Sequence, residues 1–385
     1  MEKVAGFERD NVIQGGEGST YKAISQAIAT YTMGVFQLPV KLCNELNSLC
    51  AKFWWGQVGN DKEIHWKSWD CLTQPKKEGG MGFRDLRYFN LAMLAKQGWR
   101  LLKNQESLLF KCFKARYFPR CNFLHANDSP NSSFVWKSMM AALPILRSGC
   151  CWRVGNGESI DVTKDKWIPN YPSNKLLHPV IDMDEDWKVS NLIDWDLHGW
   201  RRDILMAKFN RDEAEVVCRI PLSQWVMEDS MVWLYNRRGV YTVRFGYHLA
   251  RQVLRVESRV EASNRGGWQL AWRALWKLKL LGKIKIFGWK ACHDVLPTRV
   301  NLAKRKIISD TLCHCCKSVP EDTLHVIWGC NAAQDVWTGS LNVLQKFQTN
   351  HGDFCSFLKL WWTNYQQLRW SSSLFKRGSY GIKEM

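Results

Sequence analysis

The sequence lacks two features that membrane and secreted proteins need. No window offers roughly 18 uncharged apolar residues, the length with which a helix crosses a bilayer. Residues 1–10 carry charges where a secretory signal needs an apolar core. We therefore expect a soluble, intracellular protein with no membrane partner.

Acidic residues are also scarce relative to basic ones. The 385 residues include 54 Lys and Arg against 36 Asp and Glu, which gives a formal net charge of +18. Clustered Lys and Arg release the counterions condensed on nucleic acid, so this excess predicts a polyanionic partner. The hydrophobic content of 46% is enough for a substantial core and excludes a wholly disordered chain.

Cysteine is plentiful, at fourteen residues. Because no secretory signal precedes them, we expect reduced thiols rather than disulfides. Scattered thiols of this kind are most often small buried hydrophobes, whereas clustered ones indicate a metal. The spacing of the cysteines therefore separates the two roles.

Hydrophobic periodicity changes along the chain. From about Tyr21 to Phe118 the apolar residues recur every three or four positions, which predicts helices, with a loop at 74–82 where three glycines and a proline occur. After the polar run 126–133, Asn156-Gly157 predicts a β-hairpin within 152–160, and Arg238-Gly239 predicts a second within 231–243. The fold class predicted is α+β, predominantly helical.

The segment from Arg265 to Ile308 is basic and aromatic together. It contains eleven Lys or Arg and one acid, Asp294, so its local net charge is +10. Lys277-Leu-Lys279 and Lys283-Ile-Lys285 alternate like strands, but tryptophans at four-residue steps suit a helix, so the local structure stays open. The predicted nucleic-acid-binding residues are Arg273, Lys277, Lys279, Lys283, Lys285 and Lys290. Most of the tryptophans are expected in the core.

A pattern of potential metal ligands lies a few residues after this basic segment. Cys313, Cys316, His325 and Cys330 have the form Cys-x2-Cys-x8-His-x4-Cys, the ligand types and number of a closed tetrahedral zinc site. Four protein ligands leave no position for a reactive water, so the predicted Zn2+ is structural. A capping-box pattern at 318–321 predicts that a short helix begins there and carries His325. The neighbours His314 and Cys315 remain alternative ligands.

Many segments, in order, resemble the C-terminal part of plant non-long-terminal-repeat, LINE-type retrotransposon reverse transcriptases, including their zinc-binding domain. In the zinc-binding part these are Trp272-Arg-Ala-Leu-Trp276, Lys283-Ile-Lys-Ile-Phe-Gly-Trp289, Leu296-Pro-Thr298, the four metal positions and Ala333-Gln-Asp-Val-Trp337. Upstream they include Phe53-Trp-Trp-Gly56, Gly79-Gly-Met-Gly-Phe-Arg-Asp-Leu86, Ala115-Arg-Tyr-Phe118, Trp152-Arg-Val-Gly-Asn-Gly157 and Asp165-Lys-Trp167.

The resemblance implies four regions. These are a helical, thumb-like segment downstream of the polymerase palm (1–125), a mixed α/β connecting region with hairpins (134–260), a small zinc-stabilised module (265–340) and a truncated tail (341–385). It also implies a nuclear location. A polymerase palm needs paired aspartates for two metal ions, and no Asp-Asp pair occurs in the sequence. After Trp337 only Asp353 and Glu384 are acidic, too few for the carboxylate cluster of a ribonuclease H domain. We therefore expect no polymerase, endonuclease or ribonuclease H catalytic residues.

The function predicted is that of a non-catalytic zinc-binding fragment that grips template RNA or target DNA, with no small-molecule substrate. Two alternatives stay open. One is a protein-interaction scaffold in which the zinc organises a docking surface, and the other is a transposon relic without a role. Binding to nucleic acid weakens steeply with salt, whereas binding through an apolar interface does not, so a salt titration separates the first two.

Overall fold

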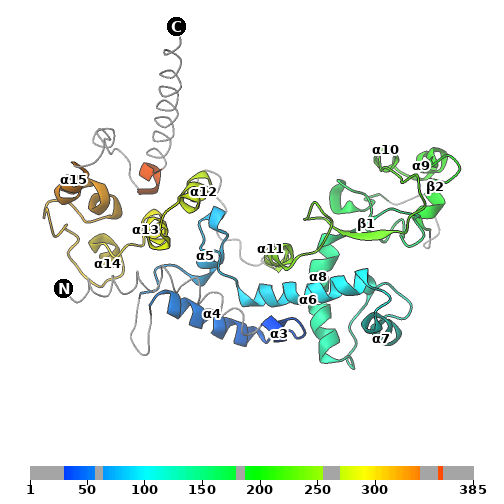
Figure 1. Ribbon diagram of the computed structural model, residues 1–385, viewed down its shortest axis with the longest axis horizontal. Helices are drawn as coiled ribbons and strands as arrows, with labels where there is room; N and C mark the ends of the chain where they lie inside the picture. The colour runs from blue at the N-terminus through cyan, green and yellow to red at the C-terminus, as the bar shows by residue number, and fades with distance from the viewer. Residues whose placement is uncertain (1–29, 57–63, 179–186, 255–268, 339–353, 359–385) are drawn as a thin grey trace, which may run out of the picture. The chain divides into compact units, whose positions relative to one another are not determined.

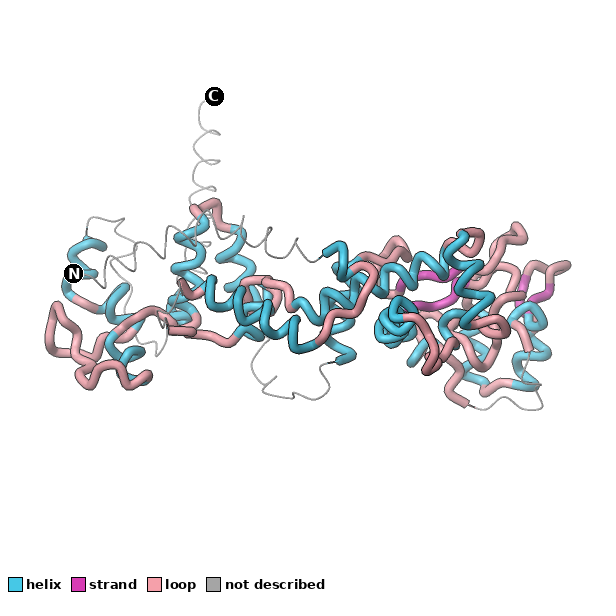
Figure 2. Tube along the Cα trace, turned by 90° about the horizontal axis from the view of Figure 1, so that it is seen from below, coloured by secondary structure: helices cyan, strands magenta, loops and turns pink. Residues whose placement is uncertain are grey.

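A computed structural model gives the fold and describes residues 30–56, 64–178, 187–254, 269–338 and 354–358. Helices dominate these residues, and the strands are few and short (Figures 1 and 2). The prediction of a predominantly helical α+β protein is therefore confirmed. Among the described residues, no helix combines the length and apolar character that crossing a membrane requires.

The chain divides into two compact units, each assembled from separated stretches of sequence. The first unit comprises residues 1–25, 46–84 and 261–385, and the second comprises residues 26–45 and 85–260. The polar run 126–133 lies inside the second unit. Residues 1–29 and most of the tail 341–385 lie outside the described residues. The four regions assigned from the family resemblance remain a prediction.

The second unit is a helical core with two small sheets. Its helices are α3 Thr30–Met33, α6 Leu86–Lys103, α7 Leu108–Tyr117, η3 Phe123–His125, α8 Phe134–Gly149, η4 Pro172–Asn174, η5 Val189–Leu192, α9 Arg202–Lys208, α10 Arg211–Cys218 and α11 Val243–Leu254. Helix α6 packs against both α8 and α11. Trp136, Trp167 and Trp233 are almost completely buried in the shared core.

Polar caps set where the main helices of this unit begin. The Asp85 carboxylate accepts a hydrogen bond from the Arg87 N–H at 2.9 Å, at the start of α6. The Ser133 hydroxyl accepts from the Trp136 N–H at 3.3 Å, at the start of α8. Such caps accept hydrogen bonds from main-chain N–H groups that have no partner within the first helical turn. The last residue of the polar run 126–133, Ser133, is therefore the N-terminal cap of α8.

The two predicted hairpins are wrong, because their segments pair with each other. Strand β1 Cys150–Arg153 runs antiparallel to β4 Ser230–Trp233. The other sheet, β2 Ile193–Asp194 with β3 Gly199–Trp200, was not predicted. The turn at Gly239 exists, since its N–H donates to the Asn236 carbonyl at 2.8 Å, but Tyr241 then enters the core instead of starting a return strand.

The carboxylate of Asp229 explains why the glycine motif after β1, which consists of Gly155, Asn156 and Gly157, forms no hairpin. Asp229 Oδ1 accepts from the N–H groups of Gly155 and Gly157 at 2.7 and 2.9 Å, and Oδ2 accepts from the Ser159 N–H at 2.9 Å. A Cβ on Gly155 would lie 2.3 Å from the Met227 carbonyl oxygen. The loop is therefore bound to the residues that lead into β4.

The first unit joins two distant stretches around its own core. Its elements are α5 Trp69–Thr73, η2 Lys76–Glu78, α12 Gln269–Lys277, α13 Gly282–Cys292, α14 Arg299–Lys304, η6 His325–Gly329 and α15 Asn331–Thr338, with the C-terminal part of α4 Val40–Trp54. Trp54, Leu72 and Phe83 cluster there with Trp272 and Trp289. The sequence did not decide whether the basic, aromatic segment around Lys277 and Lys283 forms strands or helices, and the structure shows the helices α12 and α13 there.

One main-chain carbonyl ties the two stretches together. Gly79 has a φ of +86° and its oxygen accepts from Trp289 Nε1 at 2.7 Å and from His293 Nε2 at 2.6 Å. The His293 ring stacks on Trp272 with centroids 4.8 Å apart. Burial lowers the pKa of His293 to about 4, with Lys67 acting in the same direction and the Gly79 bond opposing them. His293 is therefore a neutral, structural side chain.

Candidate functional site

A tight turn presents the first pair of sulfurs. Leu312 and Pro320 form an isolated antiparallel bridge, and the Cys313 N–H donates to the Val319 carbonyl at 2.9 Å. Inside this turn the Lys317 N–H donates back to the Cys313 carbonyl at 2.9 Å, with Lys317 at a φ of +55°. The chain therefore reverses within a few residues.

His325 lies on a short helix that begins later than the sequence predicts, and Cys330 directly follows its last residue. Asp322, not Ser318, is its cap, because the Asp322 carboxylate accepts from the His325 N–H at 2.7 Å. The segment 318–320 instead faces the strand-like residues before Cys313, and this pairing prevents it from starting a helix.

The five-residue step from His325 to Cys330 is accommodated by a wider turn. In an α-helix, five residues advance about 500°, which would place the two side chains roughly 140° apart. The segment His325–Gly329 is a π-helix, and the Cys330 N–H donates to the His325 carbonyl at 2.8 Å, an i→i+5 bond. This turn brings His325 and Cys330 to the same side.

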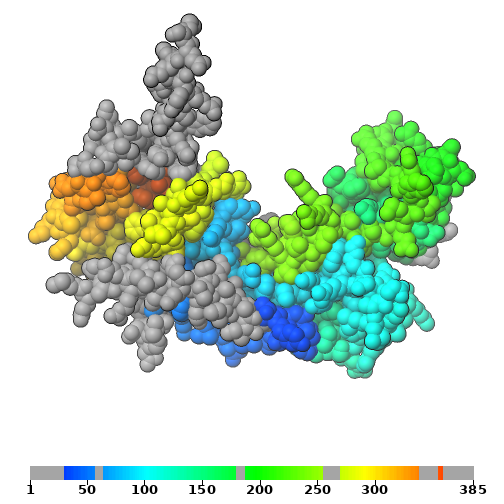
Figure 3. Space-filling model, viewed as in Figure 1, coloured from blue at the N-terminus to red at the C-terminus, as the bar shows by residue number. Residues whose placement is uncertain are grey.

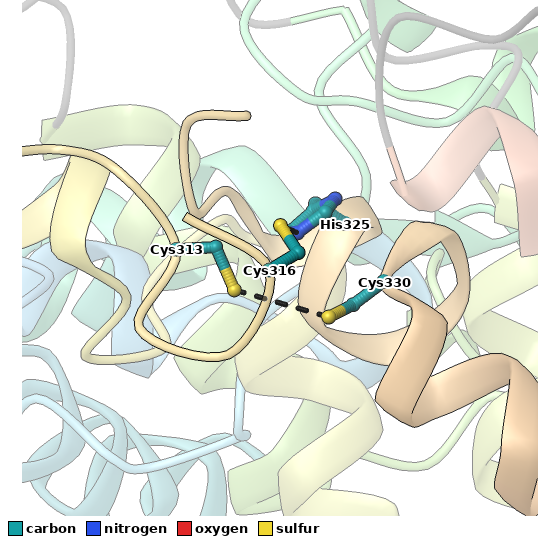
Figure 4. A group of neighbouring side chains, drawn as sticks. All are labelled: Cys313, Cys316, His325 and Cys330. Atoms are coloured by element: carbon teal, nitrogen blue, oxygen red, sulfur yellow. Dashed lines mark hydrogen bonds between the residues drawn. The ribbon is translucent and has the colours of Figure 1, made fainter. Parts of the chain in front are cut away.

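All four residues predicted to bind metal come together (Figure 4). Their ligand atoms lie within 4.8 Å of one another. Cys313 Sγ and Cys330 Sγ are 3.9 Å apart, and Cys316 Sγ lies 3.4 Å from His325 Nε2. A tetrahedral zinc with ordinary bond lengths requires separations of about 3.8 and 3.6 Å for such pairs. The arrangement therefore fits a single zinc ion.

The charge state of one thiol, Cys316, suits a cation. Hydrogen bonds from the Ser318 side chain and main chain lower the pKa of Cys316 to about 6, assisted by the Val319 N–H and His325. Main-chain N–H groups of Cys316 and Cys315 also favour the Cys313 thiolate, but burial and its thiol neighbours leave the pKa of Cys313 raised. Because thiolates are the metal-binding form, Cys316 is prepared for a metal, whereas Cys313 must lose a proton when metal binds.

The alternative ligands lie apart from this group. Cys315 and His314 are both exposed, and neither belongs to the four-residue cluster.

A hydrogen bond connects the metal cluster to the basic helices. The Thr323 hydroxyl donates to Asp294 Oδ1 at 2.7 Å, which links the helix of His325 to the end of α13. The cluster is therefore attached to the basic helices within the same unit.

The predicted nucleic-acid-binding residues lie on α12, α13 and the short connection between them. Arg273, Lys277, Lys279 and Lys283 are exposed, and Lys285 is half-buried with its Nζ 3.4 Å from the Trp276 carbonyl. Lys290 is the exception. At 8% exposure it is too buried to contact a phosphate, because the helix turns this position toward the core beside Trp289. Lys290 is therefore not part of the exposed basic surface.

Sequence reasoning missed one basic contributor. Helix η2, about 190 residues upstream, packs on α12, and the blue and yellow surfaces of these parts of the chain adjoin in Figure 3. Lys76 Nζ lies 4.4 Å from the centre of the Trp276 ring. Burial, with the Lys285 charge second, lowers the pKa of Lys76. The signal in the sequence was the pair Lys76-Lys77, which was interpreted only as part of a loop.

Comparisons with known proteins agree with this site. A family described as zinc-binding in reverse transcriptase matches residues 245–337. Over 348 residues, 87% of the chain, it is 24% identical to an Arabidopsis thaliana protein named "putative ribonuclease H protein", of which it spans 53%. Over 143 residues, 37% of the chain, it is 35% identical to an uncharacterised mitochondrial protein of the same plant, of which it covers 93%.

The fold and the site thus define a helical protein whose Cys3His cluster lies in the segment that matches the zinc-binding family of reverse transcriptases. The chain belongs to the plant retrotransposon-derived reverse transcriptases and carries a region that includes their zinc-binding segment. It spans about half the length of the first relative.

Proposed function

We propose that this chain is a non-catalytic part of a retrotransposon reverse transcriptase, in which a structural zinc ion stabilises a basic surface that binds template RNA or target DNA. The observation that carries the proposal is the Cys3His cluster, whose internal distances suit a tetrahedral ion and whose helix is bonded to the end of α13. Because four protein ligands fill the tetrahedron, the zinc would support the fold and activate no water.

The zinc part is tested by metal content. Structural zinc contributes roughly 10 to 16 kcal/mol of apparent binding free energy in small finger-like peptides, so the folding of the residues around the cluster should depend on it. We expect one zinc per chain in the purified protein, its loss in Cys330→Ser and its retention in Cys315→Ser, a matched control outside the cluster. Full folding without zinc, or loss in Cys315→Ser alone, would contradict the assignment.

The nucleic-acid part rests on exposed charge. Among the described residues, no carboxylate lies within ion-pair distance of Arg273, Lys277, Lys279 or Lys283, so their charges face solvent. Each phosphate neutralised by such a side chain lowers the log of the binding constant by about 0.9 per tenfold rise in salt on duplex DNA, and by about 0.7 on single strands.

Charge reversal locates this surface. We expect Lys279→Glu with Lys283→Glu to weaken binding to single- and double-stranded RNA and DNA, and to reduce the salt slope by about one for each phosphate that the variant no longer neutralises. The matched control is Lys41→Glu with Lys96→Glu, two exposed helical lysines of the second unit. Equal weakening in the two double variants, or none in the first, would exclude α12 and α13 as the binding surface.

A protein-docking role is the second candidate, because apolar side chains share this surface. Leu280, Leu281 and Ile284 are 46%, 64% and 44% exposed. Apolar contact is nearly independent of salt, unlike phosphate contact. Binding of a partner that survives high salt and is abolished in Leu281→Ser would favour this interpretation over nucleic-acid binding.

We also propose that the chain performs neither polymerase nor ribonuclease H chemistry, since it contains no adjacent pair of aspartates and too few carboxylates after Trp337 for a ribonuclease H cluster. Metal-dependent primer extension by the purified protein, retained after rigorous removal of other enzymes, would refute this. The nuclear location implied by the family resemblance remains part of the proposal.

A further inference from the structure

The second unit contains a pocket that the reverse-transcriptase assignment does not explain. It has a volume of about 170 Å3, several times the share of one water molecule in the liquid. It is lined by residues from the end of α8, from β1 and from the segment 164–175. The lining residues on which the argument rests are His125, Arg147, Asp165, Lys166 and Lys175.

The charge of this lining is strongly positive. Arg147, Lys164, Lys166 and Lys175 are cations, and Asp165 is the one carboxylate among the lining residues. The Asp165 carboxylate is already used, since it accepts from the Asp161 N–H at 2.9 Å and lies 4.0 Å from His125 Nε2. Basic side chains therefore outnumber acidic ones among the lining residues, and the one acid is already hydrogen-bonded.

Neutral groups hold Arg147, Lys166 and Lys175 in place without neutralising them. Lys166 Nζ donates to the Arg147 carbonyl at 2.7 Å, and Lys175 Nζ donates to the Lys164 carbonyl. The Arg147 guanidinium donates to the carbonyls of Leu124 and Ala126 at 2.7 and 3.2 Å. An ammonium has three donors and a guanidinium five, so each of these groups keeps donors for another acceptor.

The two lysines also repel one another. Burial lowers the pKa of Lys166, and the charge of Lys175 lowers it further. The main-chain carbonyls thus hold several positive charges around one small cavity. A multivalent anion in this cavity would be attracted by all of these charges. A phosphoryl group offers several acceptor oxygens and negative charge in a volume that fits the cavity.

We propose that this pocket binds a phosphoryl group, with Arg147, Lys166 and Lys175 as its donors. The site belongs to the second unit, whereas the zinc cluster and the basic helices belong to the first, and it does not depend on the function proposed for them. The phosphoryl group belongs either to a small phosphate ester or to the backbone of a bound nucleic acid, which share the same chemistry.

The test is calorimetric titration of the whole, zinc-loaded protein with inorganic phosphate. Lys166→Gln and Lys175→Gln each remove one charge but keep a donor for the carbonyl. We expect each to weaken phosphate binding about tenfold or more, the effect of losing one charged hydrogen bond. The control is Lys137→Gln. In the wild type, Lys137 Nζ donates to the Pro130 carbonyl at 3.0 Å outside the pocket, so this variant should bind phosphate as tightly as the wild type does.

Two further ligands distinguish the sources of the phosphoryl group. A 5′-mononucleotide that binds more tightly than phosphate, and no longer does so in Lys166→Gln, identifies a small ester. A short single-stranded oligonucleotide without terminal phosphates whose binding weakens in the same way identifies a backbone phosphate. If the wild type binds none of the three, or if both pocket variants bind as Lys137→Gln does, the proposal is wrong. Should Lys166→Gln fail to fold, Lys175→Gln decides alone.

Discussion

Acid should destabilise the first unit through His293. Its pKa is about 4 in the folded protein, against about 6.5 for an unperturbed histidine, because burial penalises the imidazolium. Between these two values the unfolded chain binds a proton that the folded chain does not. The stability conferred by neutral His293 is therefore complete above about pH 6.5 and is lost as the pH falls toward 4.

The size of this effect follows from the difference in pKa. Each pH unit inside the window costs about 1.4 kcal/mol at most, so the unit should lose about 2 kcal/mol between pH 7 and pH 5 and about 3 kcal/mol in total. Release of zinc on protonation of the cluster acts over part of the same range. A variant that lacks only the imidazole is needed to separate the two contributions.

The variant is His293→Gln, whose amide can still donate to the Gly79 carbonyl but does not titrate. The assay is urea-dependent hydrogen exchange of peptides from α13, at several pH values between 7 and 4.5, which reports on the first unit alone. We expect the variant to be less stable at pH 7, because it loses the stacking on Trp272, but less sensitive to acid. Equal pH dependence in the two proteins would refute the role assigned to His293.

Three further outcomes are expected. Gly79→Ala should cost at least about 1 to 2 kcal/mol of first-unit stability in urea unfolding, because its φ is +86° and its Cβ would lie 3.0 Å from a tryptophan nitrogen, while Gly199→Ala should be mild. Asp229→Asn should destabilise the second unit by about 1.5 to 3 kcal/mol in thermal unfolding, since one oxygen must give up a charged hydrogen bond. Iodoacetamide at pH 8 should label exposed Cys112 long before Cys151, since burial raises the pKa of Cys151 to about 11; equal labelling, measured by mass spectrometry, would contradict this.

The sequence was sufficient where the information is local. The four metal-binding candidates lie within eighteen residues, and ligand type with spacing identifies them without knowledge of the rest of the chain. Helices in the N-terminal part were predicted from periodicity alone, and the loop at 74–82 was predicted from its glycines and proline. The π-helical turn of η6 was not predicted, because the sequence shows only that His325 and Cys330 are five residues apart.

The sequence failed where the partner is distant. The β1–β4 pair joins residues about 80 positions apart, and the turn signals near Gly157 and Gly239 are the same whether a strand pairs with its neighbour or with a remote segment. The burial of Lys290 depends on which side of α13 faces the core, and the low amphipathicity of that helix hides it. Lys76 joins the basic surface only through packing of η2 on α12.

The split composition of the first unit has a consequence for how the protein is made. The residues on either side of Gly79 emerge from the ribosome before residues 85–260, and their partners Trp272, Trp289 and His293 emerge after them. At 5 to 20 residues per second, synthesis of the intervening 176 residues takes roughly 9 to 35 s. By the end of that interval the second unit has its whole sequence and can fold, while Trp54, Leu72 and Phe83 still lack the residues that cover them. A fragment that begins at residue 245, where the family match begins, would carry the opposite half of this core and leave Trp272 and Trp289 exposed to water.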